Sequence, residues 1–118
     1  FGTKFRSAYS ASKHALHGYF DSLRTEITPK IKITIVCPGF IKTNVTYNAL
    51  IADGSRQNTM DDAQANGMSA NECAEEILNA IQAGKQEVNI GGREKYGVLI
   101  KRFFPGVFAK IIRNAKVT

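Results

Sequence analysis

The chain has 118 residues, 43% of them hydrophobic and 22% charged, which is typical of one soluble globular domain and not of a disordered tail. No apolar run approaches the ~20 residues that a membrane-spanning helix needs. The net charge of +6 arises in residues 93–118, which hold seven basic residues and one acidic residue, so the balanced charge of residues 1–92 argues against nucleic-acid binding there.

Residues 8–27 are predicted to form a helix, because apolar side chains recur every three or four residues, at Leu16, Phe20, Leu23 and Ile27. Thr28-Pro29 should end this helix, since the residue before a proline avoids the helical conformation. The run Ile31–Cys37 is rich in β-branched residues and predicts a strand buried on both faces, as in a parallel sheet. Pro38-Gly39 should end that strand.

Residues 44–68 have a different composition, dominated by Asn, Asp, Gly, Ser and Gln, with no sustained periodicity. We expect a long loop here, either a lid or a disordered segment. Ser69 and Glu72 then form the capping-box pattern S-x-x-E, which should open a helix that ends at Gly84. A short strand is predicted at residues 87–90. This alternation of helices and strands predicts an α/β fold.

Residues 93–118 are predicted to be a basic amphipathic C-terminal extension. Apolar side chains share one helical face at Phe104, Val107, Phe108, Ile111, Ile112 and Ala115, while Lys110, Arg113 and Lys116 fall elsewhere. Pro105-Gly106 separates this helix from the apolar stretch 98–104. Two interpretations stay open: residues 98–118 contact an anionic membrane surface, or they pack on the body or on a partner subunit.

Two patterns suggest chemistry. Tyr9 and Lys13 are four residues apart in the first turns of a predicted helix and therefore share one face. A nearby positive charge favours the phenolate form, which a proton-transfer catalyst needs, although this spacing also arises by chance. The second pattern is Pro38-Gly39 followed by Thr43, just beyond a predicted parallel strand, where open α/β sheets bind ligands.

Together, the segments A-Y-S-A-S-K-H-A (residues 8–15) and T-I-V-C-P-G-F-I-K-T (residues 34–43) resemble the classical short-chain dehydrogenase/reductase family. Within it, the sequence is most similar to dehydrogenase/reductase family member 7 and the 11β-hydroxysteroid dehydrogenase-like members. The resemblance implies that residues 1–92 form the C-terminal half of a Rossmann-like, doubly wound parallel sheet, with a substrate lid at about 44–68.

The resemblance also implies roles for individual residues. Tyr9 would be the general acid/base of carbonyl/alcohol interconversion, and Lys13 would stabilise its phenolate and hold the nicotinamide ribose of NAD(P)(H). The nicotinamide ring would lie against Pro38, Gly39, Ile41 and Thr43, and the substrate near Phe40, Val45 and Tyr47. NADP(H) is favoured over NAD(H) on the resemblance alone. A lipophilic alcohol or ketone is the expected substrate, and a homo-oligomer the expected assembly.

The sequence departs from the family pattern in its cofactor and catalytic motifs. It contains neither the Gly-rich phosphate-binding turn nor the Asn-Ala-Gly segment, and Ser7, Ser10 and Ser12 are too near Tyr9 to replace the family's catalytic Ser. The chain also begins at Phe1 without a Met. We therefore expect a fragment that is inactive alone. The alternative is a non-catalytic module on the same fold that binds a membrane surface or a partner.

The remaining candidates have structural interpretations. His14 and His17 are expected to be structural or surface histidines, and no metal site is predicted. Cys37 is expected to be a small buried apolar residue. With Cys73, it shows no disulfide or metal spacing, which favours a reduced compartment. We expect a cytoplasmic location, with membrane association as the alternative that residues 98–118 leave open.

Overall fold

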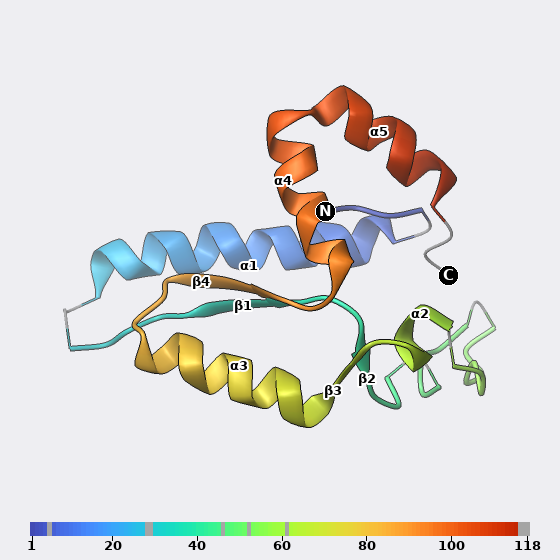
Figure 1. Cartoon of the computed structure of the whole chain (residues 1–118), viewed down its shortest axis with the longest axis horizontal. Coiled ribbons are helices and arrows are strands. Elements are labelled where there is room, and N and C mark those ends of the chain that lie inside the picture. Colours follow the sequence, from blue (N-terminus) through green and yellow to red (C-terminus); the bar gives the residue numbers. More distant parts are fainter. Residues whose placement is uncertain (5, 28–29, 46, 52, 61, 116–118) are drawn as a thin grey trace.

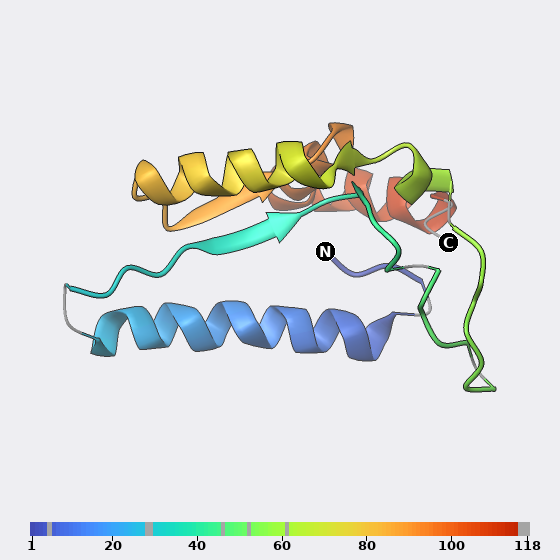
Figure 2. The ribbon, with the colours of Figure 1, turned by 90° about the horizontal axis from the view of Figure 1, so that it is seen from below.

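The computed structural model describes residues 1–4, 6–27, 30–45, 47–51, 53–60 and 62–115. Two parallel strands, β1 (Ile35–Pro38) and β4 (Glu87–Ile90), form the central layer. Helix α1 (Ser7–Glu26) lies on one face of this pair and helix α3 (Ala70–Gln82) on the other (Figures 1 and 2). The predicted α/β fold is therefore confirmed, as a part of a Rossmann-like sheet covered by helices on both faces.

Helix α1 occupies almost the predicted range. It ends at Glu26, and the N–H of Ile27 still donates to the carbonyl of Leu23. The predicted stop at Thr28-Pro29 lies outside the described residues. No residue of α1 is buried. Its apolar stripe is only partly covered by the described part of the chain, with Phe20, Leu23 and Ile27 half-buried and Leu16 exposed.

Strand β1 begins later than predicted. It starts at Ile35 and not at Ile31, because its partner β4 starts at Glu87 and pairing runs from Ile35 with Glu87 to Pro38 with Ile90. Before the first pair, the Thr34 hydroxyl donates to the carbonyl of Lys85, but Ile31 is exposed. Expected burial on both faces is also wrong. Residues 35–37 are half-buried, since β4 is the one strand that pairs with β1 among the described residues.

Helix α3 has the predicted start. The hydroxyl of Ser69 accepts from the N–H of Glu72 at 3.2 Å, and the Glu72 carboxylate accepts from the N–H of Ser69 at 3.0 Å. This is the capping box read from the sequence. The helix buries Cys73 and Ala80, and the neighbouring Ile90 of β4 has no exposed surface. Most of the small hydrophobic core therefore lies between α3 and β4.

Residues 44–68 are more ordered than expected. Strand β2 (Ile41–Lys42) pairs in parallel with β3 (Met68–Ser69), so the two ends of this segment are hydrogen-bonded together. Between them lie helix α2 (Asp62–Ala65) and an isolated antiparallel bridge from Leu50 to Arg56. The prediction of a long loop without secondary structure is thus wrong in these places. The β2–β3 pairing joins residues far apart in the sequence, which no local pattern reveals.

Residues after β4 form a 3-10 turn, η1 (Arg93–Lys95), and two helices, α4 (Tyr96–Phe103) and α5 (Pro105–Asn114), which fold back on each other (Figure 1). Phe108, which belongs to the predicted apolar face, is buried within the chain, with its ring 5.0 Å from the ring of Phe1. Lys116 lies outside the described residues. No described helix is both long and apolar enough to span a bilayer. The division at residue 92 stays a prediction.

Candidate active site

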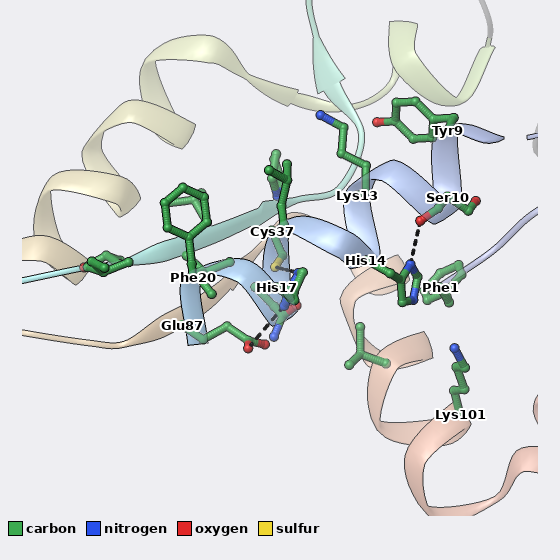
Figure 3. Close-up of a pocket in the computed structure, with 18 residues that line it drawn as sticks. Phe1, Tyr9, Ser10, Lys13, His14, His17, Phe20, Cys37, Glu87 and Lys101 are labelled. Carbon is green, nitrogen blue, oxygen red and sulfur yellow. Dashed lines mark hydrogen bonds and ion pairs between the residues drawn. The ribbon is translucent and has the colours of Figure 1, made fainter. Parts of the chain in front are cut away.

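Tyr9 and Lys13 lie on the first turns of α1 and project to the same side of it (Figure 3). The Lys13 Nζ atom is 5.5 Å from the centre of the Tyr9 ring, within the range of a cation–π contact. The Tyr9 side chain is 58% exposed, so its hydroxyl is accessible to a ligand. The i, i+4 spacing therefore produces the arrangement that the sequence predicted, with a phenol and an ammonium side by side.

Two polar side chains near this pair, Ser12 and His14, form hydrogen bonds within the helix. The Ser12 hydroxyl donates to the carbonyl of Tyr9 at 2.8 Å, and His14 Nδ1 lies 2.8 Å from the carbonyl of Ser10. Both contacts link residues three or four apart, as expected for polar side chains that bond the preceding helical turn. His14 is thus a surface histidine, as predicted.

A pocket of about 730 Å³ lies between α1 and the sheet, and it joins the two predicted patterns. Tyr9 and Lys13 contribute from the first half of α1, and Pro38 contributes from the end of β1. They meet because α1 runs opposite to β1, so the start of the helix lies beside the end of the strand (Figure 1). This is the edge at which parallel sheets bind ligands.

The other predicted nicotinamide contacts do not line this pocket. The N–H of Gly39 donates to the carbonyl of Ile90 at 2.7 Å, which continues the strand pairing by one residue. The carbonyl of Ile41 accepts from Gln64 Nε2 at 3.1 Å, and Thr43 is exposed. In the described structure, therefore, Pro38 shares the pocket with Tyr9 and Lys13, while Gly39, Ile41 and Thr43 do not line it.

The predicted substrate residues also lie outside the pocket. Phe40 is half-buried and its carbonyl accepts from the N–H of Met68 at 3.0 Å. Val45 and Tyr47 are exposed, and the carbonyl of Tyr47 accepts from the N–H of Asn58. Their proposed contact with substrate stays a prediction.

Three polar side chains of the pocket contact one another, and the sequence did not predict these contacts. His17 Nε2 lies 3.5 Å from Cys37 Sγ, and His17 Nδ1 lies 3.8 Å from a carboxylate oxygen of Glu87 (Figure 3). Burial, and then the negative charge of Glu87, raise the pKa of the Cys37 thiol. Cys37 is therefore a poor nucleophile and a hydrogen-bonded, half-buried residue, which corrects the expectation of a buried apolar one.

No local spacing could have revealed these contacts, because they join α1, β1 and β4. The described residues contain no cluster of three or more His, Cys, Asp or Glu side chains that could hold a metal ion.

The match to a known protein family includes both of the segments that carry the resemblance, residues 8–15 and 34–43. The profile of the short chain dehydrogenase family matches residues 1–53. The chain is 43% identical to Dehydrogenase/reductase SDR family member 7B of Mus musculus, over 93% of this chain and 35% of the relative. The protein of the same name from Xenopus tropicalis is 42% identical over 88% of this chain and 34% of that relative.

A more distant organism gives a similar match. Dehydrogenase/reductase SDR family protein 7-like of Dictyostelium discoideum is 42% identical over 89% of this chain and 32% of the relative. No solved structure matches the chain significantly. The chain spans about a third of the length of these curated relatives. On these matches and the α/β fold, the chain belongs to the short-chain dehydrogenase/reductase family and is similar to its member 7 branch.

Proposed function

We propose that this chain supplies the acid/base pair of an NAD(P)-dependent oxidoreductase that interconverts a carbonyl and an alcohol. The observation that carries the proposal is the placement of Tyr9 and Lys13 side by side on α1, open to the pocket that Pro38 also lines. Membership of the family supports oxidoreductase chemistry in general. We further propose that Tyr9 is the proton donor and acceptor and that the cofactor is NAD(P)(H).

The residues present fit one end of a nicotinamide cofactor. The Lys13 ammonium offers donors for ribose hydroxyls, and the exposed Tyr9 hydroxyl both donates and accepts. The 118 residues contain no Gly-rich turn of the kind that binds a pyrophosphate. The proposal therefore requires such a turn, and a catalytic Ser, in residues that precede Phe1 in the natural polypeptide.

The chemistry assigned to this chain is proton transfer. When bound, the cofactor supplies or accepts the hydride. In the reducing direction Tyr9 gives its phenolic proton to the carbonyl oxygen, and in the oxidising direction its phenolate takes the proton from the alcohol. Lys13 stabilises the phenolate because its positive charge lies against the ring. A general acid of this kind accelerates a reaction about 10²- to 10⁴-fold.

Tyr9→Phe in the natural polypeptide that contains these residues tests the proposal. We expect NAD(P)H-dependent ketone reduction to fall by at least about a hundredfold, with the melting temperature and the cofactor dissociation constant unchanged. Tyr19→Phe is a matched control, because Tyr19 lies on the same helix and is 61% exposed. Turnover that survives Tyr9→Phe, or that Tyr19→Phe lowers equally, would show the assignment to be wrong.

A second candidate function is attachment to an anionic membrane surface through α4 and α5. Large apolar side chains are exposed there, at Leu99, Phe103, Phe104, Val107 and Ile111. Basic residues accompany them, at Lys101, Arg102, Lys110 and Arg113. Apolar side chains bordered by cations favour the headgroup region of anionic lipids. The cytoplasmic location and homo-oligomeric state expected from the sequence stay predictions.

Vesicle co-sedimentation tests this second function. The variant Lys110→Glu/Arg113→Glu should weaken binding to phosphatidylserine-containing vesicles by about fivefold or more for each charge, and should leave binding to pure phosphatidylcholine unchanged. Lys30→Glu/Lys32→Glu is a control with the same charge change, placed before β1. Equal binding by all three proteins would eliminate the membrane function and leave the catalytic proposal untouched.

A further inference from the structure

Two turns meet at the active edge of the sheet, and Glu94 lies between them. Because β1 and β4 are parallel and end together, at Pro38 and Ile90, the residues that follow them emerge side by side. After β1 comes the turn of residues 38–40, and after β4 come Gly91 and Gly92, followed by η1 with Glu94 at its centre. The parallel register thus brings a carboxylate, 54 residues away in sequence, to the turn beside the catalytic pocket.

One oxygen of Glu94 joins the two turns. Its Oε1 atom accepts from the N–H of Phe40 at 3.1 Å and from the N–H of Gly92 at 3.0 Å. The direct hydrogen bond from the N–H of Gly39 to the carbonyl of Ile90 lies next to it. Hydrogen bonds from backbone N–H groups to a carboxylate are charge-assisted and about twice as strong as neutral ones. The carboxylate therefore fixes the backbone that follows Pro38.

The space for this carboxylate is made by glycines. A Cβ atom on Gly39 would overlap the Glu94 side chain, and the three atoms nearest to it all belong to Glu94. A Cβ on Gly92 would lie 2.9 Å from Glu94 Oε2. Gly91 has a φ of +144°, which a residue with a side chain rarely adopts. Each of the three positions thus lacks a side chain where one would displace the carboxylate or strain the backbone.

We propose that Glu94 is a positioning residue that holds the turn of residues 38–40 in the conformation required for nicotinamide binding. The assignment of that turn to the cofactor rests on the proposed function, whereas the link between the turns rests on the hydrogen bonds alone. Glu94 itself need not touch cofactor or substrate. Its effect passes through the backbone of Gly39 and Phe40, which lie between it and Pro38 in the pocket.

Amide hydrogen exchange tests the link without any activity assay. In the natural polypeptide, Glu94→Ala should speed exchange at the N–H of Phe40 about ten- to hundredfold, since a hydrogen bond to a charged group is lost. Glu94→Gln retains an acceptor oxygen and should restore most of the protection. Glu75→Ala removes an exposed acid of α3 and should change nothing at Phe40. Unchanged exchange at Phe40 in Glu94→Ala would overturn the proposal.

A double-mutant cycle tests whether Gly39 exists to admit the carboxylate. Gly39→Ala should destabilise the wild-type protein but should cost much less in the Glu94→Ala background, because the atoms that the new Cβ meets are then absent. Equal costs in both backgrounds would show that Glu94 does not set the requirement for glycine and would contradict the proposal.

Steady-state kinetics separate positioning from general stability. Glu94→Ala should raise the KM for NAD(P)H by about tenfold while kcat falls by less, and Glu94→Gln should recover most of this loss. Faster exchange at Phe40 with an unchanged cofactor KM would overturn the positioning role. A polypeptide that shows no oxidoreductase turnover even as wild type would count against the proposed function, and the exchange experiment would still decide the link between the turns.

Discussion

The two long helices lie on opposite faces of the β1–β4 pair and are held there by different interactions (Figure 2). Helix α3 is capped by Ser69 and contributes two buried side chains to the core around Ile90. Helix α1 buries no residue fully, and polar side chains form its hydrogen bonds to this layer: Arg24 donates to the carbonyls of Ile33 and Gln86, just before β1 and β4, and His17 contacts Cys37 of β1.

This difference places the residues that stabilise the fold and the residues proposed to react on opposite faces of the sheet. The packed face carries the residues that hold the fold together, whereas the loosely packed face carries Tyr9 and Lys13 beside an open pocket. Exposed side chains contribute little to stability but remain available to a ligand, so the two sets of residues should respond differently to substitution. We expect changes on α3 and β4 to act on the free energy of unfolding and changes at Tyr9 to act on the reaction.

The largest stability effect should follow Ile90→Ala. Ile90 has no exposed surface, and removing a fully buried Ile side chain costs about 2–5 kcal/mol. Leu16→Ala on α1, where the side chain is 46% exposed, should cost less than half as much. Urea denaturation of the natural polypeptide measures both. Equal losses would break the comparison, because they would show that α1 is covered by something other than the described residues.

A smaller loss should follow removal of the α3 cap. Ser69→Ala leaves the N–H of Glu72 without its acceptor and should lower the free energy of unfolding by about 1 kcal/mol. Ser69→Asp supplies another good capping group and should restore most of it. Denaturation midpoints of the three proteins give the result, and an unchanged midpoint in Ser69→Ala would mean that the capping box does not stabilise the helix.

The smallest effect should be a dependence on pH. Hydrogen bonds from the side chain and the backbone N–H of Ser69 hold the pKa of Glu72 below its ordinary value. The Glu72 carboxylate is therefore protonated less readily in the folded state than in the unfolded state. The contribution is complete above the unfolded pKa and is lost as the pH falls through the folded pKa. The difference in stability between wild type and Ser69→Ala should thus shrink from pH 7 to pH 3, and a constant difference would contradict it.

The sequence predicted correctly those features that depend on residues close together in the chain. The capping box at Ser69 and Glu72 predicted the start of α3, and the i, i+4 spacing predicted the Tyr9–Lys13 face. The length of β1 was predicted wrongly because a strand extends only as far as its partner does, and β4 starts at Glu87.

Features that join distant segments were out of reach. Glu94 acts across two turns, and His17 meets Cys37 and Glu87 only because a helix packs over two strands. Pro38 and Thr43 show the converse case, in which residues that are close in sequence do not share the pocket. Family resemblance grouped these residues, but the chain turns between them, and only Pro38 lines the pocket in the described structure. Sequence order alone does not show which side of such a turn faces a ligand.

The short pairing of β2 with β3 bears on how this family could diversify. It fixes both ends of the segment 43–67 near the carboxyl end of β1, whatever the length of chain between them (Figure 1). Doubling the length of such a closed loop costs only about 0.6 kcal/mol of entropy. Insertions and deletions there would leave the register of the sheet intact, so natural selection could reshape this segment repeatedly while Tyr9, Lys13 and Pro38 keep their places.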